Sequence, residues 1–191
     1  KALIAFNDKE YKKSLKFLGE NLNYLHVHIE SVELLAQIHE KRKSFKKSIR
    51  AYYFLLKKTK ANRFIQLPPN EDLEQNLKKL KKPTSRQLNY FFKISSQYLN
   101  YYDVIQEKYE IDDNIQKLKN DKKKREITIR LKERGKTRIV ITTREEKRKI
   151  LSFKILIMAE KYLRICKANN FTPGITSFML GLVEKKRGNF H

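Results

Sequence analysis

The chain has 191 residues, with 44 Lys or Arg against 21 Asp or Glu, and its formal net charge is +23. Hydrophobic residues make up 40% of it, which is enough to bury a core and excludes a disordered chain. Five Gly and four Pro provide few turn residues, which favours long helices with short connections. The single Cys excludes both a disulfide framework and a cysteine-based zinc site.

Residues 1–62 contain an internal repeat with a period of 34 residues. A shift by that period aligns residues 12–15 with residues 46–49, and small and apolar positions match as well as lysines do. Each copy has a small residue, an aromatic nine positions later and another small residue three positions further on. These sets are Ala2, Tyr11, Ser14 in the first copy and Ala36, Phe45, Ser48 in the second.

This pattern resembles the tetratricopeptide repeat family, over residues 1–62 and again over residues 174–191, where Gly181 and Phe190 are nine positions apart. The resemblance implies that each repeat is a pair of antiparallel helices whose small residues let the two backbones approach closely. The aromatic would begin the second helix. Both ends of the chain are expected to fall within a repeat, and the family's usual Trp is absent.

The resemblance also implies a concave groove, lined by the first helix of each repeat, that holds a segment of a partner protein. Glutamates stand where the carboxylate-clamp subclass of the family has Lys, Asn and Arg, so a receptor for chain termini is not expected. An acidic patch beside apolar positions suits a basic, amphipathic partner segment or the protein's own neighbouring helices. The groove residues would be Glu30, Glu33, Gln37, Glu40 and Lys41 in the second repeat and Ile175, Phe178, Met179, Leu182 and Lys185 in the last.

Residues 63–143 do not keep the period and are predicted to form a helical insertion. A short helix presents Leu73 and Leu77 on one face, and from Gln87 apolar residues recur every three or four positions, which predicts one long amphipathic helix. The aromatic residues of that helix, such as Tyr90 and Phe91, are expected in the core. The period then changes to two, and Gly135 suits a tight loop, so a β-hairpin is predicted at about residues 126–142, with one face resting on the long helices.

Residues 144–191 are predicted to form C-terminal helices that lead into a truncated repeat, with Thr172 and Pro173 at the start of the last helix. No apolar run reaches the roughly 20 residues that a membrane-spanning helix needs, so no transmembrane segment is expected. The predicted fold class is mainly all-α, namely a tetratricopeptide-like helical-hairpin solenoid fragment with a long helical insertion and one β-hairpin.

The densest basic stretch is residues 117–149, which holds 15 Lys or Arg against five acidic residues. Its cations can contact nucleic acid phosphates, an acidic protein surface or membrane headgroups, or they can simply be solvated. On the predicted hairpin they are Arg130, Lys132, Arg134, Lys136 and Arg138.

No catalytic, metal or cofactor site is predicted. His26, His28 and His39 lack metal-ligand spacing, Cys166 stands in an apolar helix where a buried inert thiol is expected, and the glycines are scattered. The predicted function is a non-catalytic scaffold that binds another protein through the repeat groove and the basic hairpin. The contact segment of that partner is expected to be acidic or amphipathic. The alternative is nucleic-acid binding through residues 117–149. The sequence indicates neither an oligomeric state nor a cellular compartment.

Overall fold

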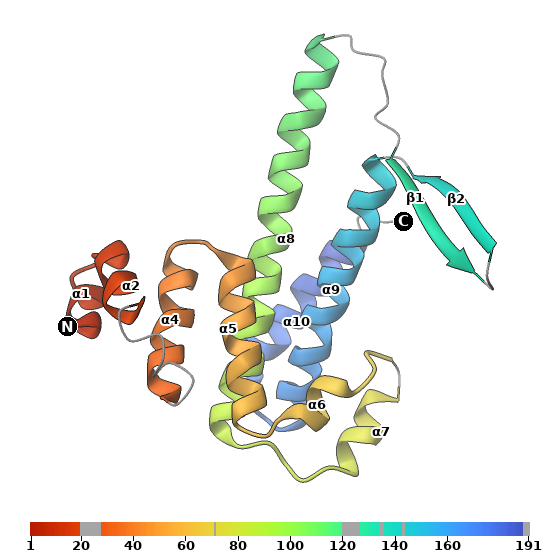
Figure 1. The fold of residues 1–191 in the computed structure, drawn as a ribbon. Coiled ribbons are helices and arrows are strands. Elements are labelled where there is room, and N and C mark those ends of the chain that lie inside the picture. Colours follow the sequence, from red (N-terminus) through yellow and green to blue (C-terminus); the bar gives the residue numbers. More distant parts are fainter. Residues whose placement is uncertain (20–27, 71, 120–126, 134–135, 143, 189–191) are drawn as a thin grey trace.

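The computed structural model describes residues 1–19, 28–70, 72–119, 127–133, 136–142 and 144–188, and it describes side chains only outside residues 111–145. The described residues contain nine helices (Figure 1). These are α1 (Ala2–Asn7), α2 (Tyr11–Gly19), α4 (Ile29–Lys41), α5 (Phe45–Lys58), α6 (Asn62–Gln66), α7 (Leu73–Lys78), α8 (Ser85–Lys119), α9 (Arg144–Ala168) and α10 (Pro173–Gly188).

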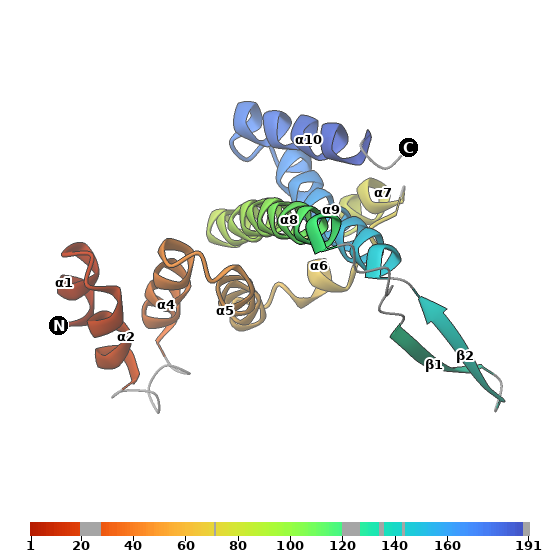
Figure 2. The same cartoon turned by 90° about the horizontal axis from the view of Figure 1, so that it is seen from above.

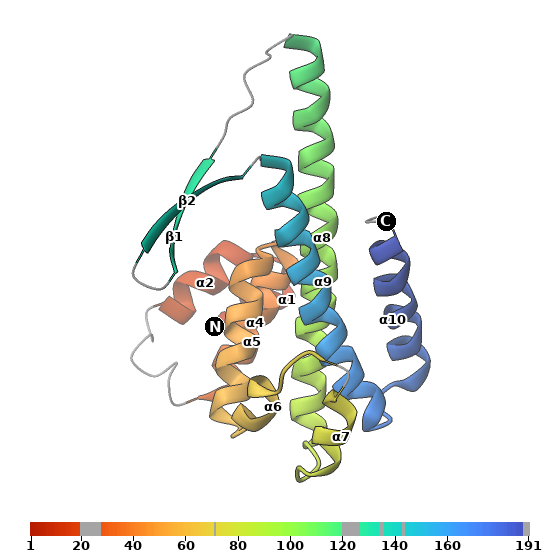
Figure 3. The ribbon, with the colours of Figure 1, turned by 90° about the vertical axis from the view of Figure 1, so that its right-hand side faces the viewer.

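The main helices form a row in which each helix packs on the next. Helix α1 packs on α2, α2 on α4, α4 on α5, α5 on α8, α8 on α9 and α9 on α10. Seen from above, α4 lies between α2 and α5, and α5 lies between α4 and α8 (Figure 2). The long helices α8 and α9 continue the row, and the short helix α7 packs against α9 (Figure 3). This nearest-neighbour packing is typical of a helical solenoid.

The internal repeat is visible as a repeated hydrogen bond. The Ser14 hydroxyl donates to the carbonyl oxygen of Ala2 at 2.8 Å, and the Ser48 hydroxyl donates to that of Ala36 at 3.1 Å. Both serines and Ala36 are fully buried. The small residues that the sequence pattern singled out therefore lie at the contacts between the paired helices.

The turn between the paired helices is also repeated. Lys9 has a φ of 62° and Lys43 a φ of 53°, so both adopt the left-handed conformation. The residue after each donates its amide to the carbonyl five positions back, Glu10 to Ala5 and Ser44 to His39, both at 2.8 Å. These bonds satisfy carbonyls left unpaired at the end of the first helix. Because the two turns share this conformation and this hydrogen bond, α2 follows α1 with the same geometry as α5 follows α4.

The core lies between successive helices of the row. Phe91 of α8 stacks on Tyr162 of α9 with ring centroids 5.4 Å apart, and both side chains are fully buried. A second cluster joins α8, α9 and α10 through residues such as Leu156 and Val183. The predicted burial of Tyr90, Phe91 and Cys166 is confirmed.

The predicted fold class needs one correction, because it counted a β-hairpin as part of the fold. Among the residues whose side chains are described, every regular element is a helix and none is a strand. Two backbone segments, β1 (Ile127–Glu133) and β2 (Lys136–Thr142), pair antiparallel, with Ile129 opposite Val140. They extend away from the helices rather than resting on them (Figures 1 and 3). A two-stranded ladder that stands apart adds nothing to a packed core, so the fold is all-α.

Candidate functional site

The acidic residues of α4 are held by the long helix α8. The guanidinium of Arg86 donates to both carboxylate oxygens of Glu33, from Nε to Oε1 at 2.9 Å and from Nη2 to Oε2 at 3.0 Å. Nη2 also lies 3.4 Å from an oxygen of Glu30. The hydroxyl of Tyr90 donates to Glu33 as well. Two parallel bonds fix the plane of the guanidinium against the carboxylate.

A second contact follows two helical turns further along both helices. Lys93 Nζ donates to Glu40 Oε1 at 3.3 Å, and the hydroxyl of Tyr52 donates to Glu40 Oε2 at 3.1 Å. Glu33 and Glu40 are seven positions apart, and so are Arg86 and Lys93. The pairs therefore keep the same register along α4 and α8. We call Glu33, Glu40, Arg86 and Lys93 the α4–α8 ladder.

The contacts around Glu33 set the charge states of Glu33 and Tyr90. Burial raises the pKa of Glu33, but the hydrogen bonds from Arg86 and Tyr90 outweigh burial, and the net pKa is lowered. Burial and the bond to Glu33 raise the pKa of Tyr90. At neutral pH Glu33 is therefore an anion and Tyr90 a protonated donor.

The predicted groove residues on α4 are thus divided. Glu33 and Glu40 bind α8, which is the alternative in which the acidic patch serves the protein's own neighbouring helices. Glu30, Gln37 and Lys41 are exposed. The sequence could not foresee this, because the partner of α4 is supplied by a segment more than 40 positions away.

The predicted groove residues on α10 are divided in another way. Ile175 is 57% exposed and Phe178 is 67% exposed, whereas Met179 is buried in the cluster with α9 and Leu182 is half-buried. Lys185 is exposed at the far end of the same stripe. Ile175, Phe178, Leu182 and Lys185 follow one another at steps of three and four positions, so they share one face of α10. We call these four residues the α10 stripe.

The remaining predicted residues lie in different settings. Tyr11 and Phe45 are half-buried at the starts of α2 and α5. Gly181 is exposed, and a side-chain carbon built on it would meet no described atom within 4 Å apart from its chain neighbours and the nearby backbone of its own helix. Phe190 lies outside the described residues. So do the side chains of the basic patch, whose contact with a polyanion stays a prediction: Arg130, Lys132, Arg134, Lys136 and Arg138.

Sequence analysis missed a polar cluster inside the fold. The hydroxyl oxygens of Tyr53 and Tyr162 are 2.7 Å apart, and that of Tyr98 lies 3.4 Å from Tyr53. Next to Tyr162, the buried Lys161 donates to the carbonyl oxygen of Ile65 at the end of α6 at 2.6 Å. Burial lowers the pKa of Lys161 to about 8. The sequence offered only a weak signal, because Lys161 follows Glu160 and lies between two short apolar stretches, residues 155–159 and 162–163.

The described residues hold no group of three His, Cys, Asp or Glu side chains that could bind a metal ion. None of the described helices combines the length and the apolar character that a membrane crossing requires. Burial raises the pKa of the Cys166 thiol to about 12, so the thiol is neutral and unreactive at physiological pH.

Comparison of the chain with protein-family models, with curated proteins and with solved structures found no match. The tetratricopeptide resemblance therefore stays a prediction, while the helical row and its internal repeat rest on the contacts given above.

Proposed function

We propose that the chain is a non-catalytic scaffold of helical repeats that binds another protein through the α10 stripe. The observation that supports it is the exposure of Ile175 and Phe178, one turn apart on α10. Exposed apolar side chains that cluster on one face are typical of contact surfaces. A row of packed helices is also a rigid support on which such a surface keeps its shape.

The stripe indicates the chemistry of the partner segment. Three apolar residues are followed by the cation Lys185 on the same face of α10. A partner segment with an apolar face and one acidic group near its end matches this order. Glu33 and Glu40 of α4 have no part in this contact, because the ladder to α8 engages them.

The test compares two variants that each replace one exposed Ile and one exposed Phe. The first replaces Ile175 and Phe178 by Ser, and the matched control replaces Ile150 and Phe153 of α9, which are 50% and 48% exposed, by Ser. The partner is first identified by photo-crosslinking from position 178, and its affinity is then measured with purified proteins. Loss of an aromatic anchor at an interface costs about 2 kcal/mol or more, so we expect the first variant to bind at least about 30-fold more weakly.

The control variant should keep the wild-type affinity. Equal affinity of the α10 variant and the wild type would exclude the stripe as the contact surface. Equal losses in both variants would show that binding follows general surface hydrophobicity and would also count against the proposal.

A further inference from the structure

Charge in the two repeats is segregated by helix. Helices α2 and α5 contain no acidic residue, whereas α4 between them carries three. Every exposed residue of α2 and α5 is a lysine or an arginine. We call these residues the cationic face: Lys12, Lys13 and Lys16 on α2, and Lys46, Lys47, Arg50, Lys57 and Lys58 on α5.

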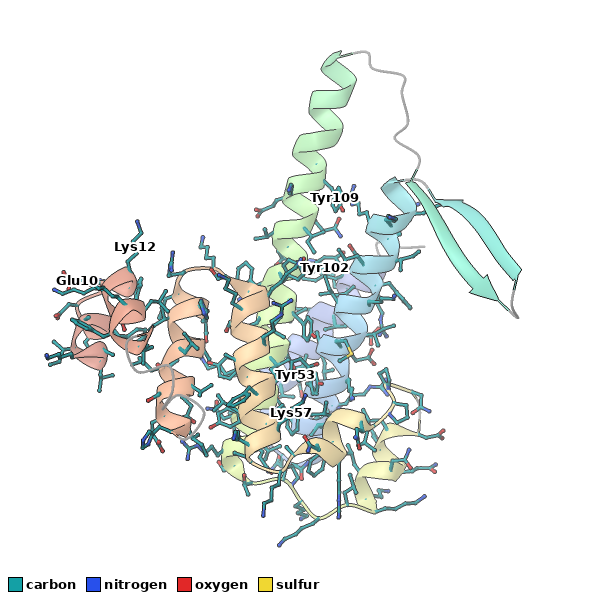
Figure 4. All side chains as sticks on the ribbon, viewed as in Figure 1. Glu10, Lys12, Tyr53, Lys57, Tyr102 and Tyr109 are labelled. Atoms are coloured by element: carbon teal, nitrogen blue, oxygen red, sulfur yellow. The ribbon has the colours of Figure 1, made fainter. Side chains whose placement is uncertain are left out.

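The cationic face is built by the repeat itself. Lys12, Lys13 and Lys16 correspond to Lys46, Lys47 and Arg50 at the 34-residue period. The same left-handed turn and the same serine bond set both helices, so the two triplets have the same local placement. Helices α2 and α5 are the second helices of successive pairs, with α4 between them in the row (Figure 2). Lys12 lies at the end of the row that α1 and α2 form, and Lys57 lies on α5 (Figure 4).

Most of these cations have no anionic partner within the described residues. Lys13 Nζ lies 2.9 Å from Glu10, Lys46 Nζ lies 5.3 Å from the ring centroid of Tyr101, and Lys58 Nζ lies 5.4 Å from that of Phe54. For the other five, the described part of the chain supplies no ion pair. Like charges gathered on a rigid surface repel one another, and an external polyanion relieves that repulsion.

We propose that the cationic face binds double-stranded nucleic acid through its phosphates, without reading the base sequence. A protein interface needs apolar or aromatic anchors, and this face exposes none, since the aromatic residues of α2 and α5 are half-buried or buried. The lack of exposed rings also disfavours single strands, which are held by stacking on aromatic side chains. Phosphates need only cations on a fixed support.

The overall charge fits this ligand. A net charge of +23 and a pI near 10.0 create a long-range field that attracts phosphates and speeds association. The cationic face is separate from the α10 stripe, so it adds a second ligand to the proposed scaffold. A failure of either proposal would leave the other unaffected. It also differs from residues 117–149, because it uses cations of the repeats.

The test measures binding of the whole chain to a labelled duplex of mixed sequence, by fluorescence anisotropy at several salt concentrations. The face variant replaces Lys12, Lys16, Lys47 and Arg50 by Gln. The matched variant replaces Lys78, Lys81, Lys154 and Lys167 by Gln; these are exposed and lie elsewhere, so both variants lose four charges. Each phosphate contact contributes about 0.9 to the slope of log affinity against log salt, so we expect the face variant to lose about 2 to 4 from that slope.

We expect the face variant to bind at least about tenfold more weakly near 0.1 M salt, and the matched variant to change less than about threefold. A milder variant with only Lys12 and Lys47 replaced should show about half the slope change, and melting curves check that each variant folds. Equal losses in the face and matched variants would overturn the proposal. So would stronger competition by polyglutamate or by phosphatidylserine vesicles than by unlabelled duplex at equal total charge.

Discussion

Gln97 lies fully buried on α8, and both polar atoms of its amide lack a hydrogen-bond partner among the described residues. An unpaired buried amide costs about 1 to 3 kcal/mol, because its hydrogen bonds to water are lost and not replaced. The free energy of unfolding of the chain is therefore lowered at Gln97, and a substitution there tests this cost.

Replacing Gln97 by Leu should raise the free energy of unfolding by about 1 to 2 kcal/mol, since Leu fills a similar volume without polar atoms. Urea unfolding of the purified chain measures it. Gln97→Glu is the control and should destabilise, because it buries a charge. A loss of stability in the Leu variant would show that the amide has a partner, such as a bound water.

Lys161 should make stability depend on pH between about 8 and 10. Its pKa is about 8 in the folded chain and has an ordinary value of 10.5. Between these values the unfolded chain binds more protons than the folded one, so the free energy of unfolding rises with pH, by about 1 to 3 kcal/mol in total. Above pH 10 the tyrosines reverse the trend, because burial raises the pKa of Tyr53 and Tyr162 in the folded chain alone.

Urea unfolding at pH 7, 8, 9 and 10 would follow this dependence. The variant Lys161→Met should lose the rise while keeping the fall above pH 10. A rise of the same size in that variant would assign the effect to another group.

At the scale of the element, the turns after α1, α4 and α5 each have a lysine in a conformation that favours glycine. Lys9, Lys43 and Lys60 all have positive φ and close α1, α4 and α5 respectively. An L-residue in this conformation costs about 1 kcal/mol relative to glycine. The turns are thus formed against a local backbone preference, which the helix packing on either side outweighs.

Replacing Lys43 by Gly should raise the melting temperature, with a gain of up to about 1 kcal/mol, because glycine adopts the left-handed conformation without strain. Lys43→Ala removes the same charge and should give no gain. Equal melting temperatures of the Gly and Ala variants would show that the backbone conformation is not the source of the effect.

Ala36 lies at the contact between the two helices of the second pair, since it is fully buried and its carbonyl accepts a hydrogen bond from Ser48. Ala36→Leu should lower the free energy of unfolding by about 1 to 3 kcal/mol through overpacking. The neighbouring Gln37→Leu adds a similar side chain at an exposed position and should change stability by less than about 0.5 kcal/mol. An unchanged denaturation midpoint for the Ala36 variant would mean that the helices can move apart at no cost.

At the scale of the whole molecule, the sequence predicted what depends on local spacing. The period placed Ser14 and Ser48 at the helix contacts, and helical periodicity placed Tyr90 and Phe91 in the core. The sequence did not predict that Arg86 contacts Glu33, because that contact depends on the path of the chain through α6 and α7. A period of two marked residues 126–142 as strands, but alternation alone does not say what a ladder packs against.

The α4–α8 ladder also has a mechanical consequence. In a row held only by successive contacts, the angle between one helix pair and the next can flex. The ladder links α4 directly to α8, although α5 lies between them in the row. This link restricts changes in the angle between the α4–α5 pair and α8, and so in the curvature of the row. The side chains of Arg86 and Lys93 remain 43% and 37% exposed, so added salt weakens the ion pairs of the ladder. The row should therefore change its bend with ionic strength while its helices stay intact.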